Sequence, residues 1–537
     1  MADQNQAPET VTCTIDGIEV VVPKGTRIID AAARAGADIP HYCYHPGLSA
    51  PAQCRMCLVE VEKAPKLVPA CVGTVAEGNV IHTQSEKALQ AREGVLEFYL
   101  VNHPLDCPVC DQAGECKLQD YVAAEGPAMG RSREPKRVLG RDDFGGDVLF
   151  YADRCVMCTR CVRFMREVAQ DERLTTVQRG HRVVIDTFFD EGLDGNIWAD
   201  NIVDICPVGA LVSKDFLHKA RAWDLDRVPS VCPNCSQGCN IRLETRDNQV
   251  MRMKPRTNEA VNSHWMCDYG RLNYNWINRG GRIEAPLVRE GDRFVPVSWS
   301  EALTRLVEML RGAPGEARAV VSPFMANEDL GALRRVMETA GFGGGVYRVE
   351  RGEEVVLPGF PTLALRPDRA ANARGAELFG FRRVGDDRAM GGLEEAAGHT
   401  GTLFVLGDEL VDAPADFGRA AGLFAYVGHF LSPVARNAHV VLPATTFAEM
   451  EGSFTNVQRR VQRFWPAIQA PGMARPAWQI LGVLHAGITG GEVPGTPADA
   501  FAVLGQLRPE FAPLEWGALG TQGQPMGGVQ ALAEAGD

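Results

Sequence analysis

Several features that are common in chains of this length are missing from the sequence. No run of 18 or more apolar residues occurs among its 537 residues, so no membrane-spanning helix is predicted. The first residues, MADQNQAPETVTC, lack the basic and apolar regions of a secretory signal. We therefore expect a cytosolic chain, whose thiols stay reduced. Basic residues are outnumbered, and the net charge of −13 argues against nucleic acid or an anionic membrane surface as the main partner.

The sequence motifs of several enzyme classes are also missing. We find no Ser-His-Asp set, no phosphate loop and no flavin or nicotinamide motif. The stretch GFGGG, residues 341–345, lacks the G-x-G-x-x-G spacing of a dinucleotide site and is typical of an ordinary glycine loop. No cysteine follows Cys267, although the chain has 16 of them from Cys13 onward. In a reducing compartment such a concentration of cysteine favours metal ligation over disulfides.

The first set of cysteines follows a predicted hairpin and helix. VTCTIDGIEVVVPKG alternates apolar residues around Asp16-Gly17, which predicts two strands and a tight turn, and TRIIDAAARAGA predicts a helix. This pattern resembles a plant-type 2Fe–2S ferredoxin with an enlarged first gap. A Rieske centre would need a C-x-x-H pair, so His41 and His45 are interpreted as loop residues and Cys13 as a buried apolar side chain. The set is spaced C-x10-C-x2-C-x13-C and consists of Cys43, Cys54, Cys57 and Cys71.

The second set follows a predicted helix, SEKALQAREGVLEFYL, which Ser85 can cap and in which Leu89, Leu96 and Leu100 are expected to share the inner face. The stretch HPLDCPVCDQAGEC then places four donors on one loop. Zinc would accept three thiolates and one imidazole, and an iron–sulfur cluster is equally compatible with this stretch alone. We predict that the histidine is a ligand, because no other fourth donor is near. The set, spaced H-x3-C-x2-C-x5-C, is His103, Cys107, Cys110 and Cys116.

The third and fourth sets have different spacings. CVMCTRC with a remote Cys-Pro is the bacterial ferredoxin signature and predicts a 4Fe–4S cluster, with a helix beginning in VRFMREVA. The third set is Cys155, Cys158, Cys161 and Cys206. The fourth, spaced C-x2-C-x3-C-x27-C, fits a 4Fe–4S cluster or a zinc ribbon and is Cys232, Cys235, Cys239 and Cys267. Fifteen cysteines and one histidine thus supply sixteen donors for four clusters, and only Cys13 is left over.

In order and spacing, these sets resemble those of the 75-kDa (G-type) iron–sulfur subunits of the proton-pumping NADH–quinone oxidoreductase, respiratory complex I. The resemblance covers residues 11–280. It implies one 2Fe–2S cluster on the first set and three 4Fe–4S clusters on the others. The second set would have His103 as its unusual ligand, and the fourth set would match a cluster that only some bacterial members have and that lies off the main electron route.

The second half is similar, more weakly, to molybdopterin oxidoreductases. The similar pieces are CDYGRLNYNWI, APLVREGDRFVPVSWSEAL and SPVARNAHVVLPATTFAEMEGSFTNVQRRVQ. The usual cysteine ligand of molybdenum is missing, and the segment has about half the length of a full catalytic unit. We therefore expect a shortened, degenerate α/β domain without molybdopterin, in a chain whose first half is α+β.

This interpretation divides the chain into six parts. We expect a β-grasp 2Fe–2S domain at 1–84, the histidine-ligated 4Fe–4S segment at 85–125 and a bacterial-ferredoxin-like 4Fe–4S domain at 126–225, which opens with a Gly-, Arg- and Pro-rich linker at 126–147. A four-cysteine 4Fe–4S domain at 226–280 and the degenerate domain at 281–520 follow, and then a loose tail at 521–537.

The resemblance implies an electron relay with no catalytic residue of its own. Electrons would arrive from an NADH/FMN-binding flavoprotein subunit, pass the His103 and Cys155 clusters and leave to a ferredoxin-like subunit on the quinone side, with the 2Fe–2S site beside this route near the entry. Such a subunit lies in the peripheral arm of the complex, on the cytoplasmic side of the bacterial inner membrane. Three alternatives remain: a subunit of an NAD-linked formate dehydrogenase, a subunit of an NAD-reducing hydrogenase, and a zinc scaffold without redox function.

Overall fold

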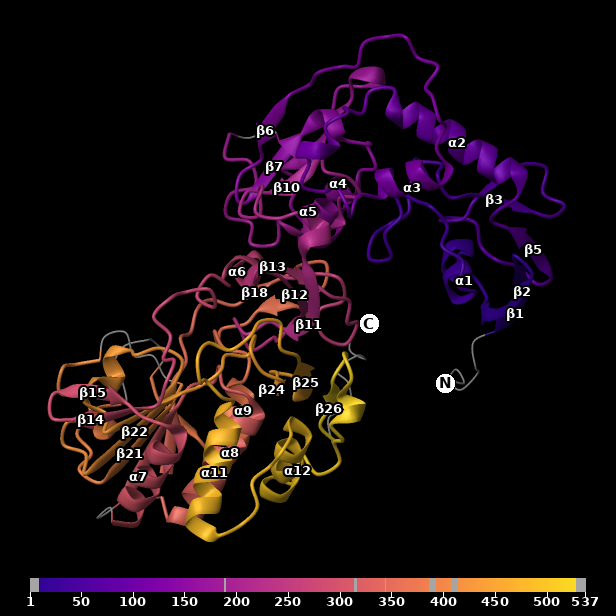
Figure 1. Ribbon diagram of the computed structural model, residues 1–537. Helices are drawn as coiled ribbons and strands as arrows, with labels where there is room; N and C mark the ends of the chain where they lie inside the picture. Colours follow the sequence, from indigo (N-terminus) through magenta and orange to yellow (C-terminus); the bar gives the residue numbers. More distant parts are fainter. Residues whose placement is uncertain are drawn as a thin grey trace. The chain divides into compact units, whose positions relative to one another are not determined.

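The structure is a computed structural model of the chain, and it separates into two compact units, Met1–Asp224 and Leu225–Asp537 (Figure 1). It describes residues 9–187, 190–312, 316–342, 344–385, 393–407 and 413–527. Within these ranges, no helix combines the length and the apolar character that crossing a bilayer requires.

The N-terminal unit begins with a five-stranded sheet in the order β2-β1-β5-β3-β4, against which one helix packs. β1 runs antiparallel to β2 and parallel to β5. The predicted hairpin is confirmed: Asp16 and Gly17 join β1 to β2 with φ of 47° and 86°, as a two-residue hairpin turn of the I′ type requires. The elements are β1 (Thr10–Ile15), β2 (Ile18–Pro23), α1 (Ile28–Arg34), β3 (Leu58–Val61), β4 (Val68–Pro69) and β5 (Asn79–His82).

The second part of this unit has short elements joined by long loops. It holds the sheet β10-β7-β6 and the hairpin β8-β9. The elements are α2 (Glu86–Leu100), η1 (Cys107–Val109), α3 (Lys117–Glu125), β6 (Arg141–Asp143), β7 (Val148–Tyr151), η2 (Ala152–Arg154), α4 (Arg160–Phe164), the π-helix η3 (Met165–Ala169), β8 (Leu174–Val177), η4 (Gly180–Arg182), β9 (Val184–Thr187), α5 (Asn201–Ile205), β10 (Leu211–Ser213) and η5 (Ala222–Asp224).

The helix α2 begins where the sequence predicts, and Leu96 of its predicted inner face is buried, but Leu89 is not. The hydroxyl of Ser85 accepts a hydrogen bond from the amide of Ala88 at 3.3 Å and caps the helix. The buried face is formed by Ala88, Arg92 and Leu96, at intervals of four residues. Leu89 is one residue away from this face and is 36% exposed, so its predicted inward position is wrong. An arginine occupies the centre of the buried face instead.

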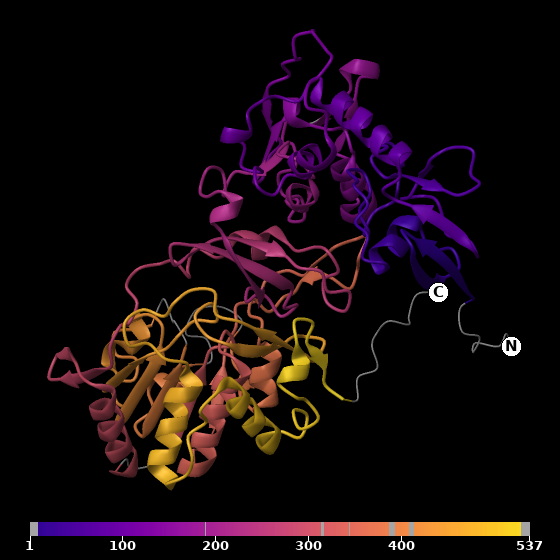
Figure 2. The same ribbon diagram turned by 45° about the vertical axis from the view of Figure 1, so that its right-hand side comes forward.

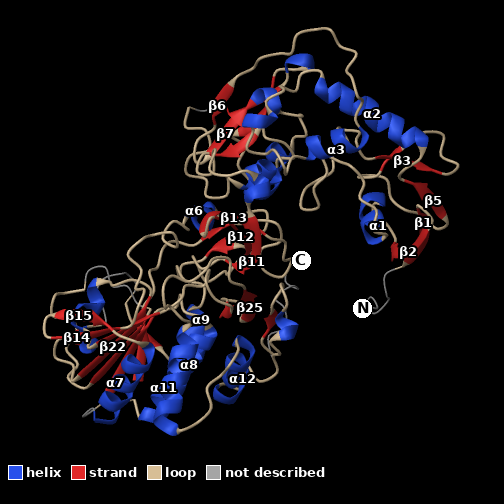
Figure 3. Ribbon diagram, in the orientation of Figure 1, coloured by secondary structure: helices blue, strands red, loops and turns tan. Residues whose placement is uncertain are grey.

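The C-terminal unit is built around an eight-stranded mixed sheet, drawn in red in Figure 3. Its order is β15-β14-β23-β22-β21-β16-β17-β20, in which the strands from β23 to β20 are parallel. The chain order reverses between β16 and β21, as in a doubly wound α/β sheet. This half is therefore α/β, as predicted.

Smaller sheets accompany it: β11-β12-β13, β24-β25-β26 and β18-β19. The strands are β11 (Asp226–Val231), β12 (Asn240–Arg246), β13 (Gln249–Pro255), β14 (Leu287–Glu290), β15 (Arg293–Pro296), β16 (Ala317–Val321), β17 (Gly344–Tyr347), β18 (Val355–Val356), β19 (Ala364–Leu365), β20 (Arg382–Arg383), β21 (Thr402–Leu406), β22 (Leu423–Gly428), β23 (Val440–Pro443), β24 (Gly452–Thr455), β25 (Arg460–Phe464) and β26 (Gln524–Pro525).

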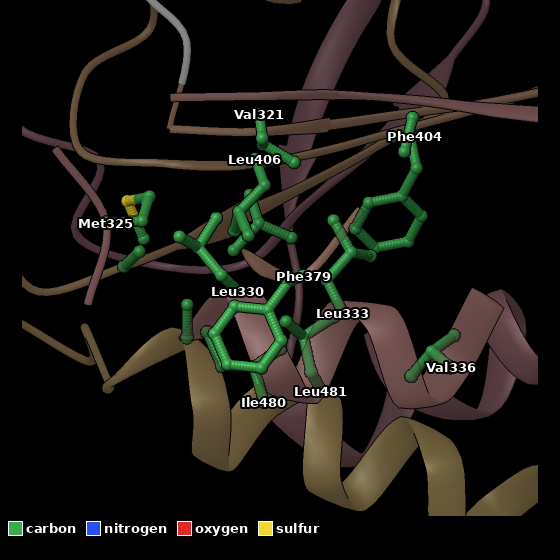
Figure 4. Packing of buried hydrophobic residues seen from close by; sticks show 14 of the residues in the cluster. Val321, Met325, Leu330, Leu333, Val336, Phe379, Phe404, Leu406, Ile480 and Leu481 are labelled. Carbon is green, nitrogen blue, oxygen red and sulfur yellow. The ribbon is translucent and has the colours of Figure 1, made fainter. Parts of the chain in front are cut away.

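Helices cover the sheet and enclose its core. In Figures 1 and 2, α8 and α11 lie side by side. Figure 4 shows Phe404 and Leu406 of β21 facing Leu330 and Leu333 of α8, all fully buried. The helices of this unit are α6 (Asp268–Leu272), α7 (Trp299–Gly312), α8 (Asn327–Ala340), α9 (Ala373–Leu378), α10 (Glu394–Ala397), η6 (Pro433–Asn437), α11 (Ala477–Thr489), α12 (Pro497–Leu507) and η7 (Gly517–Leu519).

The three glycine-rich segments differ in how much regular structure they have. Gly341 ends α8 with φ of 73°, and residues 344–345 already belong to β17, so the described part of GFGGG is a helix end and a strand start. Residues 126–147, all of which the structure describes, are mostly exposed loop with β6 as their only regular element. The tail is less loose than expected: β26 pairs with β25, and Met526 is 1% exposed. Residues 528–537 of the tail lie outside the described residues.

Candidate metal centres

The first set of cysteines lies in the long loop that follows α1 and at the start and end of the β3–β4 hairpin. All four side chains are at most 4% exposed. Hydrogen bonds from the thiols of Cys54 and Cys71 lower the pKa of Cys43, and the bond from Cys71 lowers the pKa of Cys57. The four sulfurs are therefore linked in one group. The same contacts raise the pKa of Cys54 and Cys71, so these two thiols are the donors of the group and Cys43 and Cys57 are its acceptors. Thiolates are the form that binds metal.

The backbone of this loop is bent so that amide groups point at the sulfurs. Ala52 and Arg55 have φ of 54° and 60°, in the left-handed region that residues other than glycine seldom adopt. The backbone amides of Gln53 and Cys54 act on Cys43 and lower its pKa further. Amide donors to sulfur are one of the means by which a protein tunes an iron–sulfur site.

The second set lies between α2 and α3, on η1 and the loops beside it. Cys110 and Cys116 are buried, Cys107 is half-buried, and electrostatic interactions link all three. Burial lowers the pKa of His103, which keeps its imidazole neutral, the form that ligates metal. Asp106 and Arg154 act on both His103 and Cys110.

Arg154 lies next to the third set in the chain and contacts the loop of the second set. Its side chain is 6% exposed and binds Asp106 through two nitrogens at 2.9 and 2.7 Å, and it donates to the carbonyl of Gly209 at 3.3 Å. Arg221 adds donors to the carbonyls of Cys107 and Cys110 at 3.0 and 3.1 Å. Sequence reasoning missed both arginines. Arg154 directly precedes Cys155, and this adjacency is the only signal in the sequence.

The third set surrounds a small cavity. Cys155, Cys158, Cys161 and Cys206 all line it, together with apolar side chains such as Phe150, Ile185 and Leu211. Burial raises the pKa of Cys158 to about 11, and Arg160 and Arg163 oppose that rise. The backbone amides of Val208, Ala210 and Leu211 act on the thiol of Cys206. Four thiols around one enclosed space fit the chemistry of a cubane cluster, which binds a thiolate at each iron.

The third loop resembles the first in its backbone. Met157 and Thr159 have φ of 48° and 58°. The amide of Met157 donates to the sulfur of Cys155 at 3.3 Å. The predicted helix follows as α4 and continues as the π-helix η3, with Cys161 in its first turn.

The fourth set lies in the C-terminal unit and is buried, with exposures of 4–5%. The loop between β11 and β12 carries three of its thiols, and the fourth precedes α6. Electrostatic interactions link Cys239 and Cys267 to Cys232 and Cys235. The amide of Gly270 donates to the sulfur of Cys267 at 3.4 Å, and a Cβ on Gly270 would lie 3.0 Å from the sulfur of Cys232.

The structure thus groups the thiols of each cysteine set, and His103 shares the neighbours Asp106 and Arg154 with Cys110 of the second set. Cys13 is buried in the sheet of the first domain at 1% exposure, as an apolar core residue. Among the described residues, no group of three or more His, Cys, Asp or Glu side chains has an arrangement that could hold a metal ion.

A larger cavity of about 530 Å³ lies at the carboxyl ends of parallel strands of the C-terminal unit. Ser322 follows β16 and Gly407 follows β21, so the cavity lies where the strand order reverses, the usual ligand position in such sheets. Arg348, Arg369 and His429 are among its polar lining residues, and the described lining includes no cysteine. The described lining therefore lacks the thiolate that usually ligates molybdenum.

The cysteine sets and the family models together define a class: an iron–sulfur protein in which several cluster-binding domains precede an α/β domain. Family models match the chain in this order. They are a 2Fe–2S iron–sulfur cluster binding domain at residues 8–86, the NADH-ubiquinone oxidoreductase-G iron–sulfur binding region at 92–129 and the NADH-quinone oxidoreductase subunit 3 ferredoxin-like domain at 145–212. The molybdopterin oxidoreductase Fe4S4 domain follows at 225–279, and molybdopterin oxidoreductase at 282–352 and 369–486. The predicted fold classes of both halves are confirmed.

Curated relatives carry the name of the family that the sequence resembles. The G subunit of NADH-quinone oxidoreductase from Rickettsia felis is 39% identical over 333 residues, which are 62% of this chain and 49% of that protein. The mitochondrial NADH-ubiquinone oxidoreductase 78 kDa subunit of Candida albicans is 41% identical over 336 residues, 62% of this chain and 46% of its own length. The resemblance is confirmed, although the chain spans only about half the length of these relatives.

Among solved structures, an NAD+-reducing NiFe-hydrogenase in its H2-reduced state is similar to part of the chain. The sequence identity is 27% and the TM-score 0.36, and the likeness covers 39% of this chain and 90% of that one.

Proposed function

We propose that the chain is the iron–sulfur electron-transfer subunit of a proton-pumping NADH–quinone oxidoreductase. It would pass electrons from an NADH/FMN-binding flavoprotein subunit toward a ferredoxin-like subunit on the quinone side. The observation that carries this proposal is the order of the family matches. A 2Fe–2S cluster binding domain, the NADH-ubiquinone oxidoreductase-G iron–sulfur binding region and the NADH-quinone oxidoreductase subunit 3 ferredoxin-like domain follow one another in one unit, and most of the proposed ligands within them are buried. The similarity to the Rickettsia felis protein over 333 residues supports it.

The proposed ligands are the four sets. The first set would hold a 2Fe–2S cluster, and the other three would each hold a 4Fe–4S cluster. When bound, such clusters supply single-electron transfer. The chain's own residues supply thiolates, amide donors to sulfur, and apolar walls that exclude water. His103 would supply a neutral ligand in place of a thiolate, which makes its site one charge less negative and favours the reduced state.

Metal and sulfide analysis tests this function. We expect about fourteen iron atoms per chain with as many acid-labile sulfides, from one 2Fe–2S and three 4Fe–4S clusters, and a brown protein when it is purified without oxygen. Zinc in place of iron, in a colourless protein, would contradict the proposal and support the zinc scaffold.

The second candidate is an iron–sulfur-bearing subunit of an NAD-linked formate dehydrogenase. The match to molybdopterin oxidoreductase over residues 282–352 and 369–486 favours it, as does the cavity at the strand ends. The missing cysteine after Cys267 opposes it. Molybdenum or tungsten measured on the same sample separates the two, because we expect neither metal. The other alternative, a subunit of an NAD-reducing hydrogenase, would predict co-purification with a nickel-containing partner.

A further inference from the structure

Two arginines of one short helix reach from the third cysteine set to the loop of the first set. Arg160 and Arg163 both belong to α4, which holds Cys161 and begins directly after the Cys158 loop. Because they are three residues apart, their side chains lie on the same side of the helix. Sequence reasoning missed them, since arginines in a short helix ordinarily indicate a solvated face.

The guanidinium of Arg163 bridges the backbone of a proposed ligand in each set. One of its terminal nitrogens donates to the carbonyl of Cys43 and also to the carbonyl of Cys158, the latter at 3.3 Å. The other donates to the carbonyl of Ser49. Arg160 makes a second bridge, from the carbonyl of Tyr44 to that of Ile205, the latter at 3.0 Å.

The charge of Arg163 is enclosed. The residue is 4% exposed, and electrostatic interactions link it to the thiols of both Cys158 and Cys43. The acidic neighbour is Glu167, whose carboxylate accepts from the amide and hydroxyl of Ser49 at 2.9 and 2.6 Å. Water therefore screens this charge little, and a buried charge acts at a lower effective dielectric than a surface one.

We propose that Arg163 is a positioning residue shared by the first and third centres, and that its single charge raises the reduction potentials of both together. This inference rests on the proposed function, because it requires clusters on both sets. Reduction adds a negative charge to each cluster, and a nearby fixed cation stabilises that charge. One cation in contact with both ligand loops links the two potentials, so neither can be set independently of this residue.

Potentiometric titration followed by EPR tests the proposal in the full chain. In Arg163→Met, which removes the charge and keeps an unbranched side chain, we expect both potentials to fall. At a fixed solution potential the ratio of reduced to oxidised cluster should fall about tenfold at each centre, which is about 59 mV for a one-electron couple. The centres on the His103 and Cys232 sets should keep their potentials.

Three further variants distinguish charge from structure. Arg163→Lys keeps the charge and should keep both potentials near those of the wild type. Arg166→Gln removes a charge of the same sign three residues later, but that side chain is 61% exposed, so no shift is expected. The side-chain amide of Gln53 donates to the carbonyl of Met157 at 2.7 Å, which is an uncharged hydrogen bond between the same two loops. Gln53→Ala removes it and should not shift the two potentials together.

The outcomes separate this inference from the function on which it rests. If the wild type shows no cluster signals, the proposed function itself fails. If the signals are present and Arg163→Met shifts neither potential or only one, the shared role is overturned. An equal joint shift in Gln53→Ala would also overturn it, because loop contact rather than charge would then be the cause. If Arg163→Met does not assemble both centres, Arg163→Gln is the second neutral variant, with the same expected shift and the same contradicting result.

Discussion

Gly209 packs directly against the sulfur of Cys110. A Cβ on Gly209 would lie 2.2 Å from that sulfur and 3.1 Å from the Cβ of Gln112. Gly209 belongs to the loop of Cys206, so a segment of the third set forms part of the wall around the second. The amide of Lys117, beside Cys116, also donates to the carbonyl of Pro207 in that loop, at 3.0 Å.

This contact makes Gly209→Ala a precise probe of the second set. The added methyl group cannot fit at 2.2 Å, so either the Cys110 thiol or the Cys206 loop must move. We expect the EPR signal of the His103 centre to be lost or clearly altered, with one cluster fewer in the iron analysis. Gly94→Ala in α2 is the control, because no atom lies within 4 Å of its Cβ position. An unchanged His103 signal in Gly209→Ala would show that the predicted ligand set is wrong.

His103 gives a second prediction, which concerns charge. His103→Cys replaces a neutral imidazole by a thiolate, so the cluster should be retained and its potential should fall. His103→Ala should lose that signal alone. His41→Ala is the matched control: His41 is also half-buried in a loop beside a cysteine set, and its Nδ1 lies 2.7 Å from the carbonyl of Ile39. EPR spectra that are the same in His103→Ala and the wild type would exclude His103 as a ligand.

The buried arginine of α2 should be important for stability. Arg92 is fully buried and pairs with Glu125 of α3 at 2.5 Å, and it donates to the carbonyl of Thr83 at 2.9 Å. Arg92→Met leaves the largely buried carboxylate of Glu125 without its cation, and we expect a loss of about 3–5 kcal/mol. Thermal unfolding followed by circular dichroism would measure it.

The same helix provides the control for this loss. Lys87→Met breaks an ion pair with Glu60 in which the lysine is 73% exposed, and it should change stability far less than Arg92→Met does. Equal losses in the two variants would show that burial of Arg92 adds nothing. In the double variant Arg92→Met/Glu125→Gln, part of the lost stability should return, because no unpaired charge remains.

A pH prediction follows from Glu328, at the start of α8. Burial raises its pKa from an ordinary 4.5 to about 8, although the hydroxyl and amide of Ser453 donate to it at 2.6 and 2.9 Å. The folded chain therefore holds this proton up to a higher pH than the unfolded chain does. The contribution of this group to stability is complete below about pH 4.5 and declines as the pH rises toward about 8.

Glu328→Gln should lack that decline. Relative to the wild type, the variant should gain stability between about pH 4.5 and pH 8, by up to about 1.4 kcal/mol per pH unit. Glu338→Gln, at an exposed position of the same helix, is the control and should follow the wild type. Parallel stability curves for Glu328→Gln and the wild type would contradict the raised pKa. The neighbouring Asp329, whose pKa burial raises to about 7, is present in all three proteins.

Local sequence signals predicted the parts of the fold that depend on nearby residues. The Asp16-Gly17 turn follows from backbone conformation, and the start of α2 follows from the Ser85 cap. The burial of Arg92 could not be predicted, because it depends on Glu125 in another helix. The pattern of leucines placed Leu96 correctly and Leu89 wrongly, since apolar character alone does not show where a buried ion pair will form.

In the candidate site, too, the sequence predicts what nearby residues determine and does not predict contacts between distant segments. Spacing along the chain groups the donors that share a loop, because such donors stay close together. The remote members Cys71, Cys206 and Cys267 reach their sets only through the fold. Spacing does not show what lies behind the sulfurs. Gly209, Arg154 and Arg163 contact sets to which they do not belong by sequence, and the pairings of the large sheet likewise join strands that are far apart in the chain. Such contacts exist only after folding.

The Cys206 loop contacts the second set through the hydrogen bond between Lys117 and Pro207, and these contacts can form only late in synthesis on the ribosome. A nascent chain that has emerged as far as Cys116 already carries every predicted ligand of the second set. The loop that covers Cys110 emerges some ninety residues later. At the usual rates of translation the delay is about 5–20 seconds, and during it iron placed on these ligands would be open to oxygen. Delivery of iron to this set is therefore expected to follow emergence of the Cys206 loop rather than that of Cys116.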